Sequence, residues 1–210
     1  MENVFSILFC LTLFYVAVTY RVKAYVTVLA VQGALLSFLL FIPLLNNFNP
    51  FSIVLPLTIL LVKAIIIPVY INKIILKLDV KRKIEPTIQP MAFLSLVIVT
   101  IVLTFVFSIF LSSITQLEII PFAVGFSSIF TGIYIIMFRK KLIVHVCGFL
   151  ILENGIFLLS TAVASELPMT IELGVLLDLF VVVFLMGIAL NRIKSTFSGF
   201  EVSHLDRLKD

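Results

Sequence analysis

The stretch KLIVHVCGFLILENGIFLLSTAVA (141–164) decides the fold, because it is a long apolar run with a carboxylate near its centre. About twenty apolar residues in a helix can cross the hydrocarbon core of a bilayer. An ionised acid in that core is costly unless it faces a bundle interior, finds a partner or stays protonated. Glu153 in this stretch and Asp178 in IELGVLLDLFVVVFLMGIAL (171–190) therefore indicate proton movement inside a membrane assembly.

The composition places the chain among polytopic membrane proteins. Of its residues 62% are hydrophobic and 12% charged, and the mean hydropathy is +1.27. A soluble domain carries roughly 25% charged residues. The formal net charge of +4 does not indicate nucleic-acid binding, because the basic residues lie in short stretches between apolar runs. We therefore expect an all-α, multi-pass protein of the cell membrane.

The apolar runs predict seven transmembrane helices, separated by polar or proline-containing connectors. The N-terminus is apolar almost from its start and lacks a basic region followed by a cleavage site, so we expect a retained first helix. The expected spans are residues 3–20, 24–45, 51–74, 90–112, 119–138, 142–165 and 171–191.

The basic residues predict the orientation of these spans. Every lysine and arginine except Lys63 follows an odd-numbered span, whereas the even-numbered connectors carry none. Cytoplasmic connectors are enriched in lysine and arginine. The N-terminus is therefore expected outside and the C-terminus in the cytoplasm.

Lys63 breaks this pattern, since it lies inside the third apolar run. It is about ten residues, or roughly 15 Å of helix, from Lys73, which is too deep for simple snorkelling. Glu153 and Asp178 lie roughly 18 and 21 Å from the basic residues at the ends of their helices. All three ionisable groups are thus expected in one central layer of the membrane.

Each of these groups also has a purely structural interpretation. The acids can serve only to hydrogen-bond neighbouring helices, and Lys63 can form a simple ion pair that holds helices together. Lys63 can also neutralise an acid or carry a proton, and Pro68 is expected to kink the helix beside it. Glu172, near the outer mouth of the last span, and His145, near the cytoplasmic start of the sixth, are weaker candidates for a proton path.

The sequence contains no pattern for chemistry of its own. It has no Walker loop, no glycine-rich dinucleotide fingerprint, no metal-ligand cluster and no convincing nucleophile–base pair. Its two cysteines, Cys10 and Cys147, lie in apolar spans without metal-ligand or disulfide spacing, and we expect them to be core residues. We predict no cofactor, and we expect any redox reaction to occur in another polypeptide.

The segment GFLILENGIFLL (148–159), the last apolar run and the tail HLDRLKD (204–210) resemble membrane component E of hydrogenase-4-type complexes. The shorter segment LVKAIIIP (61–68) is similar to the same pattern. The resemblance divides the chain into a four-helix segment, 1–115, and a three-helix segment, 116–210. This second segment is similar to the K-type (4L) subunit of complex I and to the C subunit of Mrp antiporters.

The resemblance implies a membrane subunit of a group 4 nickel–iron hydrogenase or formate hydrogenlyase. Its expected partners are antiporter-like and quinone-site-like membrane subunits, lipid, and peripheral hydrogenase subunits at the cytoplasmic face. Asp178 matches the second intramembrane acid of the K-type subunit, whereas Glu153 lies three positions from the first acid when Gly148 and Asn154 are aligned. A subunit of a multisubunit cation/proton antiporter and a structural spacer are the two alternatives.

Overall fold

The computed structural model describes residues 2–46, 53–77, 88–115 and 117–163, and in addition Gly174, Leu177, Phe180, Phe184 and Gly187. Within these residues the chain is helical and contains no strand element, which confirms the predicted all-α class. Most of the predicted last span, 171–191, lies outside the described residues, as does the whole of segment 78–87. The number of membrane spans and the orientation of the termini stay predictions.

The helices follow the predicted apolar runs closely. The third run is continuous but divides into α3, a π-helical segment η2, and α4. Five of the described helical runs are long and apolar enough to cross a membrane, and α1 is shorter at 17 residues. The chain is therefore a membrane protein by the length and composition of its helices. The bounds are α1 Glu2–Val18, α2 Val22–Asn46, α3 Val54–Ile59, η2 Leu60–Ile66, α4 Ile67–Lys77, α5 Pro90–Ser112, α6 Ile119–Phe138 and α7 Leu142–Val163.

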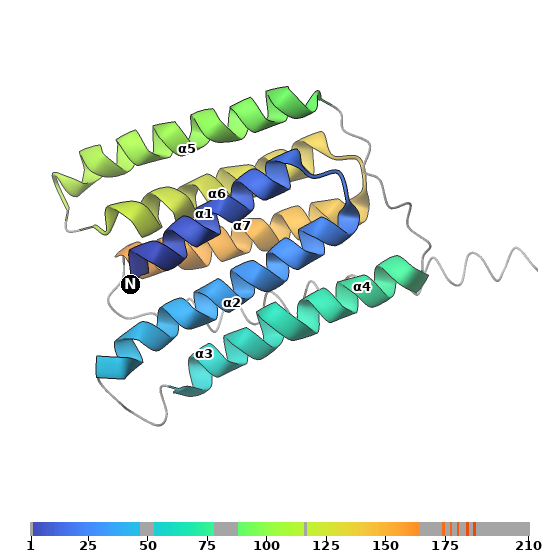
Figure 1. The fold of residues 1–210 in the computed structure, drawn as a ribbon, viewed down its shortest axis with the longest axis horizontal. Coiled ribbons are helices and arrows are strands. Elements are labelled where there is room, and N and C mark those ends of the chain that lie inside the picture. The colour runs from blue at the N-terminus through green and yellow to red at the C-terminus, as the bar shows by residue number, and fades with distance from the viewer. Residues whose placement is uncertain are drawn as a thin grey trace, which may run out of the picture.

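The helices lie side by side as a bundle (Figure 1). Helix α6 packs against α7 on one side and α5 on the other, and α1 contacts both α5 and α6. Helix α2 contacts α1, α7 and the run formed by α3, η2 and α4. This arrangement places the centres of α2, η2 and α7 against one another, although they are far apart in the sequence.

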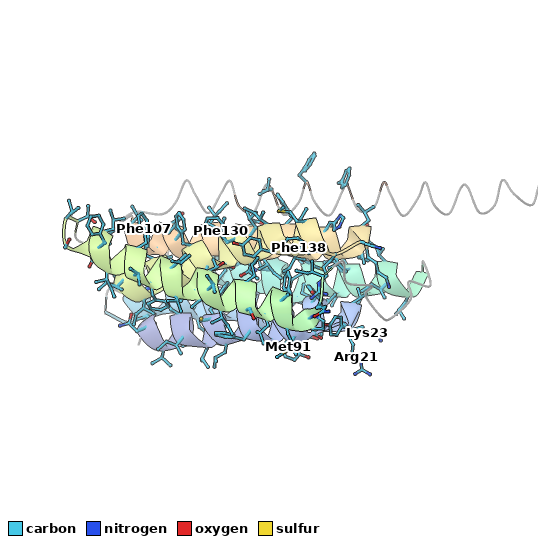
Figure 2. All side chains as sticks on the ribbon, turned by 90° about the horizontal axis from the view of Figure 1, so that it is seen from above. Arg21, Lys23, Met91, Phe107, Phe130 and Phe138 are labelled. Atoms are coloured by element: carbon cyan, nitrogen blue, oxygen red, sulfur yellow. The ribbon has the colours of Figure 1, made fainter. Side chains whose placement is uncertain are left out.

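The described basic residues between spans gather at one end of the bundle. Arg21 and Lys23 lie there, at the turn between α1 and α2 (Figure 2). The turn between α6 and α7, residues 139–141, lies at the same end because the helices alternate in direction (Figure 1). The clustering agrees with the charge pattern on which the predicted orientation rests.

Two pairs of glycines bring α6 and α7 together. A Cβ atom built on Gly155 would lie 2.8 Å from the Gly125 carbonyl oxygen, and one on Gly148 would lie 3.0 Å from that of Gly132. Backbones can approach this closely in a membrane only where side chains are absent. Ser128 adds a hydrogen bond of 2.9 Å to the Ile151 carbonyl between these two points. The contact fixes the rotation of α7 and therefore the direction of its central polar residues.

Aromatic rings run in a row along α6 and cover its contact with α5. Their spacing of four residues puts successive rings on one helix face, where centroids lie 5.5 to 6.4 Å apart. Phe107 of α5 continues the row, and Phe107, Phe130 and Phe138 are spread along the bundle in Figure 2. The members on α6 are Phe122, Phe126, Phe130, Tyr134 and Phe138.

Candidate functional site: a buried ion pair at the centre of the bundle

Lys63 and Glu153 form a buried ion pair between η2 and α7. The Lys63 Nζ atom lies 2.8 Å from the Glu153 Oε1 atom, and each side chain is only 5% exposed. Glu153 lies near the middle of α7, which runs from Leu142 to Val163. The sequence predicts that both groups occupy one central layer, and the structure brings them into direct contact.

The backbone around Lys63 departs from an α-helix. Residues Leu60–Ile66 form a π-helix with Lys63 at its centre, and Pro68 follows in α4. Proline has no N–H group, and its ring crowds the carbonyl of the residue four positions earlier, here Ala64. A π-helical turn widens the backbone at that point, and such turns are frequent at functional sites. The irregularity lies where Pro68 predicts one.

A glycine on α2 allows the π-helical segment to approach closely. A Cβ atom on Gly33 would lie 2.8 Å from both the carbonyl carbon and the Cβ atom of Lys63. Only a residue without a side chain fits against this backbone. Gly33 therefore sets the distance between α2 and η2, and with it the position of Lys63 relative to α7.

Hydrogen bonds extend from the ion pair across two further helices. Lys63 Nζ also donates to Asn154 Oδ1 at 3.2 Å, and Asn154 Nδ2 donates to Gln32 Oε1 at 3.2 Å. Gln32 Nε2 donates to Thr12 Oγ1 at 2.8 Å, and that hydroxyl donates to the Phe9 carbonyl at 2.6 Å. Lys63, Asn154 and Gln32 are all buried. One continuous polar chain thus joins η2, α7, α2 and α1.

The last span approaches the ion pair at Gly174. A Cβ atom on this glycine would lie 3.3 Å from Glu153 Oε1. Asp178 and Glu172, which the sequence also places on a proton path, lie outside the described residues. Their role stays a prediction.

His145 belongs to a different part of the bundle. Its Nε2 atom contacts the backbone carbonyl oxygen of Arg139 at the turn between α6 and α7. A carbonyl oxygen only accepts hydrogen bonds, so this nitrogen carries the proton. His145 lies two turns of α7 before Glu153, at the basic end of the bundle, and its role as a relay stays a prediction.

A second cation is buried at the basic end of the bundle. Arg139, only 3% exposed, follows the last residue of α6. Its guanidinium carbon lies 5.3 Å from the ring centroid of Tyr20 and 4.7 Å from that of Phe93. The faces of aromatic rings attract cations, which offsets part of the cost of burial.

Two buried polar residues, Gln32 and Arg139, are not among the site residues that the sequence identifies. Gln32 is absent from the predicted candidates, although a glutamine followed by glycine in the apolar run AVQGALL (30–36) marks a polar position inside a span. Arg139 is expected at the cytoplasmic surface with its neighbours Lys140 and Lys141, and nothing in its local sequence distinguishes it from them. Its burial depends on the ring of Tyr20, in the turn between α1 and α2, and on that of Phe93 in α5.

An ammonium–carboxylate pair can hold its protons in two arrangements without leaving an unpaired charge. Either both groups are charged, or a proton lies on the carboxylate and the amine is neutral. A single charge left without its partner in this environment is strongly unfavourable. Among the described residues no group of three His, Cys, Asp or Glu side chains could hold a metal ion.

No family model matches the chain, and no solved structure matches it. The uncharacterized protein Rv0085 of Mycobacterium tuberculosis is 26% identical to the chain over 86 residues. That similarity covers 41% of this chain and 39% of the relative, so the chain matches about two fifths of that protein's length. This identity does not establish a family, and the resemblance to component E stays a prediction.

Proposed function

We propose that this chain is a non-catalytic membrane subunit of an ion-translocating redox complex of the group 4 hydrogenase type. In this proposal the Lys63–Glu153 pair takes up and releases a proton near the middle of the membrane. The observation that carries the proposal is the buried pair itself, with Nζ and Oε1 2.8 Å apart at the centre of apolar helices. Ionisable groups inside membrane spans commonly mark ion and proton pathways.

Further residues extend this path in the proposal. Asp178 provides the second acid, and Glu172 and His145 serve at the outer and cytoplasmic sides. The chain lies in the cytoplasmic membrane with its N-terminus outside, beside antiporter-like and quinone-site-like subunits. Support for an outside N-terminus comes from the basic residues that gather at one end of the bundle.

Neutral variants of the acids test the mechanism. Glu153→Gln and Asp178→Asn keep size and hydrogen bonding but remove the titratable proton. We expect either change to reduce proton pumping by the purified complex in vesicles, while soluble-dye redox activity and assembly persist. Glu118→Gln, at the residue before α6, is the matched acid outside the spans and should pump normally. Full coupling in the Glu153→Gln, Asp178→Asn double variant would contradict the proposal.

The two alternatives give different outcomes. The hydrogen-bond chain across four helices is the observation that favours a structural spacer, and a spacer would tolerate the neutral amides but not alanine. A subunit of a cation/proton antiporter would co-purify with antiporter subunits but without a nickel–iron subunit. Mass spectrometry of the complex after mild detergent extraction separates these cases.

Thiol labelling tests the orientation. Cysteines introduced at Asn47 and Ser165 should react with an impermeant reagent in sealed right-side-out vesicles. Cysteines at Arg82 and Lys140 should react only in inverted vesicles. Equal labelling of all four positions in right-side-out vesicles would overturn the seven-span topology.

A further inference from the structure

The polar chain that leaves Lys63 has a fixed direction. A lysine ammonium has donors and no acceptor, so Asn154 must turn its oxygen toward Lys63 and its NH2 group toward Gln32. Gln32 must then present its oxygen to Asn154 and its NH2 group to Thr12. The Thr12 hydroxyl passes its own hydrogen to the Phe9 carbonyl. The charge of Lys63 therefore orients every group along the chain.

This direction stabilises the charged form of Lys63. The amide dipoles of Asn154 and Gln32 both point their oxygen ends toward the ammonium group. Hydrogen bonds in a low-dielectric interior polarise one another, so an aligned series is stronger than its separate members. The side chains of Asn154 and Gln32 are buried and therefore act in such an interior.

The same groups cannot conduct a proton. A proton moves along a hydrogen-bonded chain only if each member can accept a proton on one side and release one on the other. A carboxamide oxygen is a very weak base, and a carboxamide NH2 group does not release its hydrogen near neutral pH, so neither takes part in proton transfer as histidine or a carboxylate does. Two consecutive carboxamides, Asn154 and Gln32, therefore interrupt any proton transfer toward α1.

On the side of the ion pair away from Asn154 and Gln32, Glu153 lies beside a glycine. Gly174 presents no side chain to Glu153 Oε1, and a Cβ atom there would lie only 3.3 Å from this oxygen. Glu153 thus faces the charged Lys63 from η2 and the backbone of Gly174, whereas the hydrogen-bond chain on the other side runs through the uncharged side chains of Asn154 and Gln32.

We propose that Asn154, Gln32 and Thr12 form a positioning arm that holds Lys63 against Glu153 and ends the proton path, so that Glu153 exchanges its proton on the side of Gly174. This inference rests on the proposed function, since it requires that Glu153 binds and releases a proton. It adds a role for Gln32 and a direction for the transfer.

Infrared spectroscopy of the full-length protein in lipid vesicles tests the arm. The protonated-carboxyl band of Glu153 is identified by its loss in Glu153→Gln. Gln32→Met should raise the ratio of protonated to ionised Glu153 at neutral pH roughly tenfold, because Lys63 loses the oriented amides that stabilise its charge. Ser37→Ala is the matched control, because it removes a buried α2 hydrogen bond, to the Pro56 carbonyl, outside the arm. An unchanged ratio in Gln32→Met would overturn the positioning role.

The rate at which this band appears after a rapid drop in pH tests the direction. Gly174→Val should slow the appearance by roughly an order of magnitude, since its side chain occupies the space beside Oε1, and Gly174→Ala should slow it less. Gly187→Val is the matched control on the same span, because a Cβ atom there has nothing within 4 Å. Gln32→Met should not lower the rate constant of proton uptake, because its effect on the ratio should lie in the rate constant of proton release.

The possible failures are distinguishable. If Gln32→Met slows the proton uptake and Gly174→Val does not, the path runs through the arm and the inference is wrong. If Glu153 shows no protonation in the wild-type protein at any accessible pH, the proposed function fails as well. Gly174→Ala adds a single methyl group, so normal rates in a correctly folded Gly174→Ala and Gly174→Val pair would also overturn the direction.

Discussion

The protein buries two cations in different ways, and the difference separates a structural charge from one that can take part in proton exchange. Lys63, at the centre of the bundle, contacts a carboxylate and an amide oxygen. Arg139, at the basic end, lies between the rings of Tyr20 and Phe93. Both groups are almost fully buried, at 5% and 3% exposure.

The two environments differ in what they can do with a proton. Arginine keeps its proton at all physiological pH values, and aromatic rings cannot accept one. Arg139 is therefore a fixed charge that joins the end of α6 to the turn between α1 and α2 and to α5. Lysine can lose its proton, and a carboxylate can take it. A buried charge alone does not indicate a proton path, and the proposed proton exchange depends on the type of partner that Lys63 has.

The largest effect is expected from breaking the central pair on one side. Glu153→Ala leaves the Lys63 charge buried without its carboxylate, which should destabilise the protein by about 3–5 kcal/mol. The Lys63→Met, Glu153→Leu double variant removes both charges and should be destabilised much less. The free energy of unfolding of both variants is measured in mixed micelles, with the loss of helicity as the signal. Equal destabilisation in the single and double variants would show that the charges do not compensate each other.

The sequence predicts where the helices lie and which layer of the bundle Lys63 and Glu153 occupy, but not the contact between them. Helix positions follow from long apolar runs, and the central layer follows from counting residues between Lys63, Glu153 and the basic helix ends. The contact between Lys63 and Glu153 depends on how α2, η2 and α7 pack, which periodicity does not specify. The π-helix likewise depends on how the helices pack, and Pro68 indicates it only in part.

The sequence gives still less information on the side chains that surround each of the two buried cations. Gln32 is recognisable as a polar residue within a span, but its partner Asn154 lies on a helix far away in the sequence. Arg139 belongs to a run of three basic residues, and its burial against the rings of Tyr20 and Phe93 is not visible in that run. Pairings between distant segments are set by packing, and a single sequence does not record them.

The glycine contact behind the central pair should give the next largest effect. A Cβ atom on Gly155 would lie 2.7 Å from the Ser128 Cβ atom and 2.8 Å from the Gly125 carbonyl oxygen, so α6 and α7 must separate. Gly155→Ala should destabilise the bundle by about 1–3 kcal/mol, and it should also displace the adjacent Asn154. Gly187→Ala has nothing within 4 Å and should be neutral. The same unfolding assay measures both variants. Equal stability of Gly155→Ala and Gly187→Ala would mean that the glycines do not set the distance between α6 and α7.

Replacing Arg139 should have a smaller effect and sharpens the contrast with Lys63. Arg139→Met removes two cation–ring contacts and should cost about 1–2 kcal/mol of stability, and Arg139→Lys should recover part of that loss. The protonated-carboxyl band of Glu153 should not change in either variant. Lys63→Met, by contrast, should make this band prominent, because an isolated buried carboxylate is more stable when protonated. An altered Glu153 band in Arg139→Met would show that the two cations are coupled.

The smallest effect is expected at a polar contact that involves neither cation. Thr104 Oγ1 and Ser127 Oγ lie 2.6 Å apart between α5 and α6, and both side chains are buried. Hydrogen bonds between membrane helices contribute about 0.6 kcal/mol on average, because each group finds other partners when the contact is lost. Thr104 and Ser127 have such partners, since each hydroxyl also lies within hydrogen-bond distance of a backbone carbonyl, that of Ile101 and that of Ala123, to which it can donate when the contact is lost.

A double-mutant cycle with Thr104→Val and Ser127→Ala isolates this contact. Thr104→Val keeps the shape of the side chain, and we expect a coupling energy of about 0.5 kcal/mol between the two positions. Thr115→Val, at an exposed hydroxyl beyond the end of α5, is the control and should be neutral. A coupling as large as that between Lys63 and Glu153 would mean that neutral hydroxyl pairs hold this bundle as firmly as the buried charges do.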